Sequence, residues 1–261
     1  MDILFYIFAG AGVGLAVGLT GVGGGSLMTP LLILSGVPEK IAIGTDLLYA
    51  AATKTGAMHA HHRQGTIRWQ IVLMLAAGSL PASLITSYIL NTWDFDYGPR
   101  LSNILGVMLI LTGVVVFLKQ RLQGETSATE LSVGWVHKHS KSITFFAGIA
   151  LGVFVTLSSV GAGAFCAALL LTLYPRLPAL HVVGTDIAHA VPLTLIAGIG
   201  HFFNDNIDFK LLGGLLIGSL PAVHLGSKAA AKVPNSILQP ILASLLIIIG
   251  IKFAFFAGAG H

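Results

Sequence analysis

The sequence predicts an all-α integral membrane protein, a polytopic helical bundle of two inverted-topology repeats with broken or half helices. Three observations support this: the composition, the long apolar runs, and an internal repeat whose charge bias changes sides. Of the 261 residues, 55% are hydrophobic and 9% are charged, and the mean hydropathy is +0.88. Since about a quarter of the residues in a soluble domain are charged, the composition excludes a soluble enzyme and a nucleic-acid-binding protein.

Apolar runs supply the expected membrane helices. A helix of about 20 residues crosses a hydrocarbon core roughly 30 Å thick, and in lipid its backbone must be satisfied internally. The runs are continuously apolar without alternation, so they predict helices rather than barrel strands. No Lys or Arg precedes the first run, which favours a retained membrane segment over a signal peptide. The runs cover about 3–19, 26–36, 41–60, 69–90, 101–118, 143–157, 164–174, 182–200, 211–227 and 237–257.

Three motifs occur twice, which indicates a duplicated five-segment unit. The first repeat is predicted at 1–118, a cytoplasmic linker at 119–141 and the second repeat at 142–261. The first two motifs recur after 140 residues and the third after 138. They are Gly-Thr-Asp at 44–46 and 184–186, Gly-Ser-Leu-Pro-Ala at 78–82 and 218–222, and a glycine-rich run at 22–25 and 160–163.

Charges at equivalent loops predict that the two halves have opposite orientations. The loop at 61–68 is basic, whereas its counterpart at 201–210 contains two aspartates, and the bias reverses between 91–100 and 228–236. Because Lys and Arg collect on the cytoplasmic side, we expect 61–68, 119–141 and 228–236 inside. The segments 91–100 and 201–210 and both termini are then outside. Inverted repeats are typical of secondary transporters that alternate access to one site.

Each repeat contains a helix that runs into glycines, followed by an apolar arm of about 11 residues, or roughly 16 Å. An interruption at this depth presents free backbone N–H groups and hydroxyls that suit an anion. The alternative is that the glycines only permit close helix contact. The substrate-binding candidates here are Thr20, Gly23, Gly24, Gly25 and Ser26 in the first repeat, and Ser158, Ser159, Gly161 and Gly163 in the second.

Charged residues within the apolar runs form a second group of candidates. Asp46 and Asp186 lie about two turns into equivalent helices, where a carboxylate is costly unless it is paired or functional. They are predicted either to carry a coupling proton or to make a structural hydrogen bond. Lys54, eight residues after Asp46 and near the same helix face, could neutralise Asp46, contact an anionic substrate or snorkel to the membrane boundary. Thr45 and Thr185 are expected to line the cavity.

Histidines and the single cysteine are weaker signals. His189 and His224 fall in apolar runs, where each could carry a proton or make one interhelical hydrogen bond, and His189 is retained as a coupling candidate. The cluster at 59–62 adjoins a basic loop, which favours an interfacial position over a metal site. Cys166 is expected to be a small buried packing residue. Neither a metal site nor a cofactor is predicted.

Together these motifs resemble the sulfite exporter family (TauE/SafE-like), also called the toluene sulfonate uptake permeases. The resemblance covers nearly the whole chain. It rests on G-V-G-G-G-S-L-M-T-P-L-L at 21–32, the boxes at 44–46 and 78–82, the basic stretch near Arg63, and weaker copies 140 residues later. It implies a proton-coupled transporter of sulfite or organosulfonates in a bacterial or archaeal inner membrane. Ala162 and Ala164 depart from the pattern, so the two halves need not contribute equally.

The predicted function is therefore a secondary transporter of a small sulfur-containing anion, working by alternating access. A divalent-metal permease is one alternative, because His181 and Asp186 form an H-x4-D reminiscent of nickel and cobalt permeases, although Ile187 stands where a second histidine is expected. An intramembrane enzyme is disfavoured, since the sequence lacks H-E-x-x-H and G-x-S-x-G. The expected partners are a small anionic substrate and membrane lipid, without nucleic acid, and a homodimer is left open.

Overall fold

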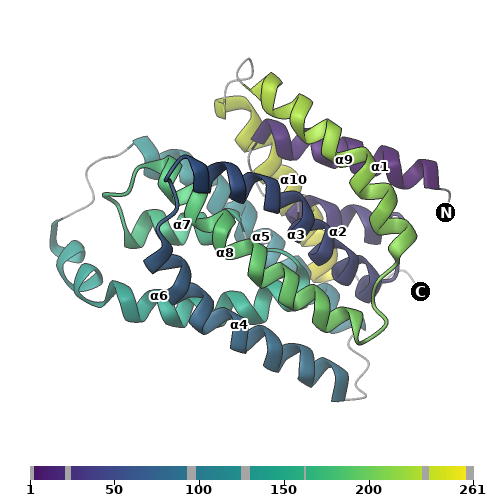
Figure 1. Cartoon of the computed structure of the whole chain (residues 1–261), viewed down its shortest axis with the longest axis horizontal. Coiled ribbons are helices and arrows are strands. Elements are labelled where there is room, and N and C mark those ends of the chain that lie inside the picture. The colour runs from purple at the N-terminus through teal and green to yellow at the C-terminus, as the bar shows by residue number, and fades with distance from the viewer. Residues whose placement is uncertain are drawn as a thin grey trace.

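The computed structural model describes residues 3–20, 25–92, 98–124, 130–161, 163–230 and 235–256, and within them every regular element is a helix (Figure 1). This confirms the predicted all-helical architecture. The helices are α1 (Ile3–Thr20), α2 (Gly25–Leu34), α3 (Glu39–Arg63), α4 (Trp69–Thr92), α5 (Gly98–Gly124), α6 (Glu130–Ser158), α7 (Ala164–Leu173), α8 (Ala179–Phe202), α9 (Phe209–Ala230) and α10 (Asn235–Phe256).

Most helix boundaries agree with the apolar runs to within a few residues, but α5 and α6 extend well past them. α5 continues to Gly124 and α6 begins at Glu130, so the described part of the predicted linker at 119–141 is helical. The end of an apolar run indicates where a helix is expected to leave the membrane, and the helix itself can continue beyond that residue. The stretch contains Lys, Gln, Leu and Glu, which favour helix in water as well.

By length and apolarity, five helices in the described ranges could cross a membrane. They cover Trp69–Thr92, Leu101–Leu118, His139–Ser158, Ala179–Phe202 and Phe209–Gly226. Shorter apolar helical stretches cover Ile3–Leu19, Ala164–Leu173 and Pro240–Phe255. α3 contains Asp46 and Lys54 and is less apolar, yet it packs along α8 through the middle of the bundle.

Two equivalent helix pairs flank the bundle, since α1 corresponds to α6 in the repeat and α9 corresponds to α4. α1 packs along α9 at one side, and α6 packs along α4 at the other (Figure 1). Glycines bring the backbones together: a Cβ on Gly218 would collide with the Ile7 carbonyl oxygen, and one on the equivalent Gly78 would collide with the Phe145 oxygen. Small residues permit this close approach in a membrane, where the hydrophobic effect does not drive helices together.

Gly218→Ala should destabilise the protein far more than Gly213→Ala, although both glycines lie in α9. A Cβ at 213 meets nothing within 4 Å, so alanine there should be neutral or stabilising by up to about 1 kcal/mol through helix propensity. At position 218 the helices must move apart, which we expect to cost about 1–3 kcal/mol. Thermal unfolding in detergent measures both. Equal melting temperatures for the two variants would contradict the close α1–α9 contact.

The central pair, α3 and α8, consists of equivalent helices that run antiparallel. Gly44 contacts His201, Gly198 contacts Leu48, and Gly184 contacts His61. The residue numbers of these facing pairs (44 and 201, 48 and 198, 61 and 184) add to 245 or 246, whereas equivalent positions of the repeats differ by 140. Both conditions hold only near residues 52–53 of α3 and 192–193 of α8. At that level the two helices cross, and each contact on one side of it has an equivalent contact on the other side.

α5 and α10 are also antiparallel, since Gly106 of α5 packs against Ala254 of α10 and Gly113 packs against Ala243. A hydrogen bond from Ser102 to the first residue of α3 holds the start of α5 beside the start of α3. The start of α5, the end of α10, the start of α3 and the end of α8 therefore lie at one end of the bundle.

Candidate functional site

The chain is interrupted between α6 and α7, as the glycines of the second repeat predicted. α6 ends at Ser158, and the connecting residues include Ser159 with φ +57° and Gly161 with φ +109°. Glycine adopts a positive φ without strain, whereas serine adopts it at an energetic cost. Residues held in such a strained conformation are concentrated at functional sites. α7 has 10 residues, or about 15 Å. An arm of this length reaches only partway through a membrane.

The two serines at this interruption have different roles. Ser158 donates a hydrogen bond to the Phe154 oxygen at 2.7 Å and accepts one from the Val160 nitrogen at 3.2 Å. Its hydroxyl proton is therefore used by the backbone, and Ser158 stabilises the interruption instead of offering a donor to a substrate. Ser159 is 3% exposed, and its hydroxyl has no hydrogen-bond partner within the described part of the chain.

Asp46 lies beside Ser159, so a carboxylate of the first half meets the interruption of the second. Asp46 is fully buried, and its Oδ2 accepts a hydrogen bond from Thr29 of α2 at 2.5 Å. Ser159 interacts with the same carboxyl group, yet neither its hydroxyl nor Asp46 Oδ1 makes a hydrogen bond of normal geometry to a described residue. Buried polar atoms are almost always satisfied in folded proteins. This pair is suited to a proton or a water molecule.

Lys54 is a half-buried residue within two positions of the level where α3 and α8 cross, close to the centre of the molecule. Asp46 and Asp186 each precede that level by six to seven residues on antiparallel helices, so they lie about 10 Å to either side of it. The Lys54 charge interacts most strongly with Asp186 and next with Asp46. The sequence had connected Lys54 to Asp46 through helix periodicity, but only the antiparallel packing brings it to Asp186. Thr194 occupies the equivalent position of α8, so the cation is not repeated there.

His189 makes an interhelical bond, which is one of the two roles predicted for it. Its Nε2 lies 2.8 Å from the Ser79 hydroxyl of α4, and its Nδ1 lies 3.9 Å from Cys166 Sγ. Cys166 is fully buried, as expected, and lies beside Asp186. The residues equivalent to His189 and Ser79, Tyr49 and Ser219, also interact. The two clusters therefore correspond under the repeat, with histidine in one and tyrosine in the other.

Thr45 and Thr185 do not contribute free hydroxyls to the centre. Thr45 Oγ1 accepts a hydrogen bond from the Asp208 nitrogen at 3.1 Å, and Thr185 Oγ1 accepts one from the Arg68 nitrogen at 3.0 Å. Thr185 also donates to the His181 oxygen at 2.6 Å. Each threonine thus holds the backbone that follows the equivalent helix of the other half. That both threonines line a cavity stays a prediction.

These contacts belong to two interlocks at opposite ends of the α3–α8 pair. The His61 interlock comprises His61, Thr66, Gly184 and Thr185, and the His201 interlock comprises His201, Asn206, Gly44 and Thr45. His61 Nδ1 lies 2.8 Å from Thr66 Oγ1, and His201 Nδ1 lies 3.4 Å from Asn206 Nδ2. Sequence reasoning missed both. The signal was a histidine followed five residues later by a polar residue, repeated after 140 residues.

The remaining candidates are at the ends of helices. Thr20 ends α1, and Gly25 and Ser26 begin α2, whereas Gly23 and Gly24 lie outside the described residues. Gly163 precedes α7 at its N-cap. The anion-binding role of the first glycine run therefore stays a prediction.

The other histidines do not form a metal site. His59 and His62 are exposed, and the His62 ring contacts Trp69 edge to face with centroids 5.7 Å apart. His224 is exposed too. Within the described ranges, no three His, Cys, Asp or Glu side chains are grouped so that they could hold a metal ion.

The chain matches the family model described as "Sulfite exporter TauE/SafE" over residues 6–253. It is 34% identical to the "Probable membrane transporter protein YjnA" of Bacillus subtilis (strain 168), covering 94% of this chain and 97% of the relative. It is 26% identical to "Probable membrane transporter protein YdhB" of the same organism, with 90% and 96% coverage. A "Probable membrane transporter protein" of Haemophilus influenzae is 27% identical, with 96% and 97% coverage. No solved structure matches the chain.

The family match covers nearly all of the chain, and the apolar helices that could cross a membrane agree with it. Its Gly-Thr-Asp motifs lie where the structure buries Asp46 and Asp186. The chain is a polytopic helical membrane protein, and it belongs to the sulfite exporter TauE/SafE family.

Proposed function

We propose that the protein is a proton-coupled secondary transporter of a small sulfur-containing anion, sulfite or an organosulfonate, in the cell inner membrane. The observation that carries this is Lys54, a cation near the crossing of two equivalent helices with one carboxylate on each side. At this position a solute can reach the Lys54 ammonium first from one side of the bundle and then from the other.

The charges of the centre favour proton coupling. Two carboxylates and one ammonium leave one net negative charge, and a further buried anion without compensation is costly. An oxyanion can join Lys54 at low cost only if a proton neutralises Asp46 or Asp186. His189 lies close to Asp186 through Cys166 and is a third proton-carrying candidate. Transport of anion and proton together follows from this balance.

Alternating access is supported by the two interlocks. Both are closed in this structure, one at each end of the α3–α8 pair. Each is built from a Gly-Thr of one half and a histidine of the other. If one interlock opens while the other stays closed, the central site is exposed to one face of the membrane. In an inverted repeat, the equivalent change in the other half exposes it to the opposite face.

Uptake into proteoliposomes tests the function. Labelled sulfite or methanesulfonate should accumulate when a pH gradient is imposed, and collapse of the gradient with a protonophore should abolish the accumulation. Protein-free liposomes are the control. Uptake of a divalent metal ion without any response to these anions would contradict the proposal.

Reporter fusions test the inverted orientation. Among the described side chains, the His61 end carries Arg63, Arg68, Lys141 and Arg176 and no carboxylate, so the positive-inside rule favours a cytoplasmic position for it. A phosphatase and fluorescent-protein pair fused after Gln64 should report the cytoplasm, and after Asn206 the outside. Reporting from the same side at both positions would overturn the inversion.

A further inference from the structure

A cavity of about 280 Å³ opens at the end of the bundle that carries the His201 interlock. It lies between the start of α3, the ends of α4 and α8, the start of α5 and the turn after α8. None of the central charges, Asp46, Lys54 or Asp186, lines it. Its polar and charged residues are Lys40, Asn91, His201, Asn204, Asp205 and Asn206.

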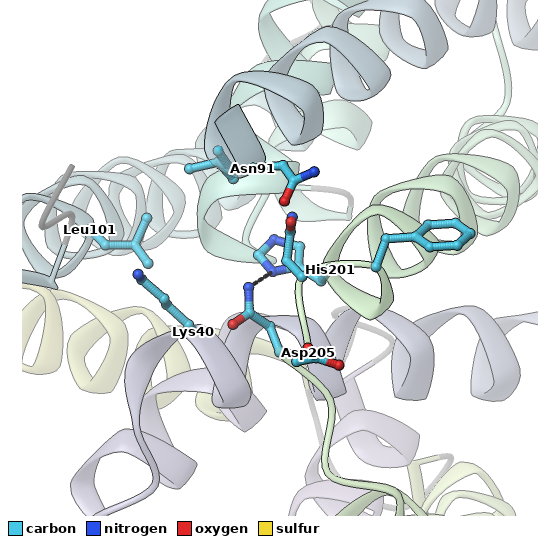
Figure 2. Close-up of a pocket in the computed structure, with 9 residues that line it drawn as sticks. Lys40, Asn91, Leu101, His201 and Asp205 are labelled. Atoms are coloured by element: carbon cyan, nitrogen blue, oxygen red, sulfur yellow. Dashed lines mark hydrogen bonds between the residues drawn. The ribbon is translucent and has the colours of Figure 1, made fainter. Parts of the chain in front are cut away.

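Hydrogen bonds hold one wall of this cavity in place. His201 Nε2 lies 2.9 Å from the Thr156 carbonyl oxygen, which can only accept, so Nε2 carries the proton. In the neutral ring Nδ1 then accepts the bond from the Asn206 amide, shown dashed in Figure 2. Asn206 keeps a second N–H, and Asn91 points toward His201 from α4 (Figure 2). The second N–H of Asn206 is therefore a donor beside this space.

Lys40 provides a positive charge on the other side. Its neighbour Glu39 accepts a hydrogen bond from Ser102 of α5, which holds that carboxylate against α5. Asp205 also lines the cavity and lies below His201 in Figure 2, so the two charged lining residues, Lys40 and Asp205, have opposite signs. A water molecule takes about 30 Å³ in the liquid, so the cavity has room for a small oxyanion with part of its hydration shell.

The cavity adjoins the His201 interlock. His201 forms part of its lining and also contacts Gly44, two residues before the buried Asp46. We propose that the cavity is a second anion site, a vestibule in which Lys40 and the Asn206 amide bind a small oxyanion of the sulfonate class before the His201 interlock opens. The proposed function supplies only the identity of the solute. The site itself follows from the cavity, the Lys40 ammonium and the Asn206 amide.

The test measures the charge selectivity of the cavity with a thiol at position 91. Asn91→Cys places this thiol on the lining. The native Cys166 is fully buried, and labelling of the parent protein, which contains Cys166 but not the new thiol, measures the background. The purified full chain is reacted with 2-sulfonatoethyl methanethiosulfonate and with its trimethylammonium analogue. Relative to free cysteine, the anionic reagent should be favoured. Adding Lys40→Gln should reduce that preference about five- to tenfold, the size expected for one charge a few ångströms away.

Matched variants separate a binding site from a general surface effect. Arg63→Gln removes a cation at the opposite end of the bundle and should leave the preference unchanged, and Lys40→Arg should preserve it. Methanesulfonate at millimolar concentration should slow the reaction of the introduced thiol with neutral methyl methanethiosulfonate, and Lys40→Gln should abolish that protection. Equal preferences with and without Lys40, or no protection by methanesulfonate, would overturn the vestibule.

Two further outcomes are informative. Protection in phosphatidylcholine nanodiscs that disappears in phosphatidylglycerol nanodiscs would assign the cavity to a lipid headgroup and overturn the proposal. Because labelling needs no transport, a Lys40-dependent anion preference combined with absent sulfite and methanesulfonate uptake would refute the transport function alone. Uptake without the anion preference would refute the vestibule alone.

Discussion

Lys54→Gln should reduce anion transport by on the order of 100-fold or more while leaving the protein folded. An anion enclosed at the centre forms a buried pair with Lys54, and removing one partner of such a pair costs about 3–5 kcal/mol. About 1.4 kcal/mol corresponds to a factor of ten. In the variant, Asp186 and Asp46 can adapt by binding protons, so the fold survives. Initial rates of sulfite or methanesulfonate uptake, at equal protein per liposome, measure the effect.

Two companion variants make this result specific. Lys54→Arg keeps the charge and should retain part of the rate. The double variant Lys54→Thr with Thr194→Lys exchanges the residues of equivalent positions, so it moves the cation across the crossing point and should restore transport above the level of Lys54→Gln. Undiminished transport by Lys54→Gln would remove the central claim about the site. A double variant no better than the single one would contradict the equivalence of the two positions.

The sequence was sufficient for the architecture because its signals are local. Apolar length identifies the helices, and the Gly-Thr-Asp and Gly-Ser-Leu-Pro-Ala boxes identify the repeat. The interruption at 158–163 was predicted for the right reason: an arm as short as α7 reaches only partway through a membrane. The burial of Asp46 and Asp186 followed from their place in apolar runs.

The partners of these residues could not be predicted, because they depend on how the halves pack. Helix periodicity connects Lys54 to Asp46 within one helix, and only the antiparallel arrangement of α3 and α8 brings Asp186 to the same cation. The same packing explains the hydrogen bonds of Thr45 and Thr185. They follow glycines that allow the turn after the equivalent helix to approach, so their hydroxyls bond that backbone. A motif can therefore be recognised from the sequence although its partners in the other half cannot.

A disulfide across either interlock should stop transport, and reduction should restore it. A Cβ on Gly44 would lie 2.9 Å from His201 Cβ, and one on Gly184 would lie 3.2 Å from His61 Cγ. Disulfides need Cβ atoms about 3.5–4.5 Å apart, so Gly44→Cys with His201→Cys requires a small outward shift; Gly184→Cys with His61→Cys is the matched pair. Oxidation closes one end permanently, and alternating access needs both ends to open. We expect uptake to fall to the level of empty liposomes in each oxidised double variant.

The informative comparison is between the two locked ends. With the His201 end locked, the centre can open only toward the His61 end, so a membrane-impermeant thiol reagent should reach a cysteine introduced at Ser159 from that side alone. With the His61 end locked, the accessible side should reverse. Each reduced double variant serves as the control for the substitutions themselves. If either oxidised variant still transports at the rate of its reduced form, that interlock is a packing contact and the gate must lie elsewhere on the α3–α8 pair.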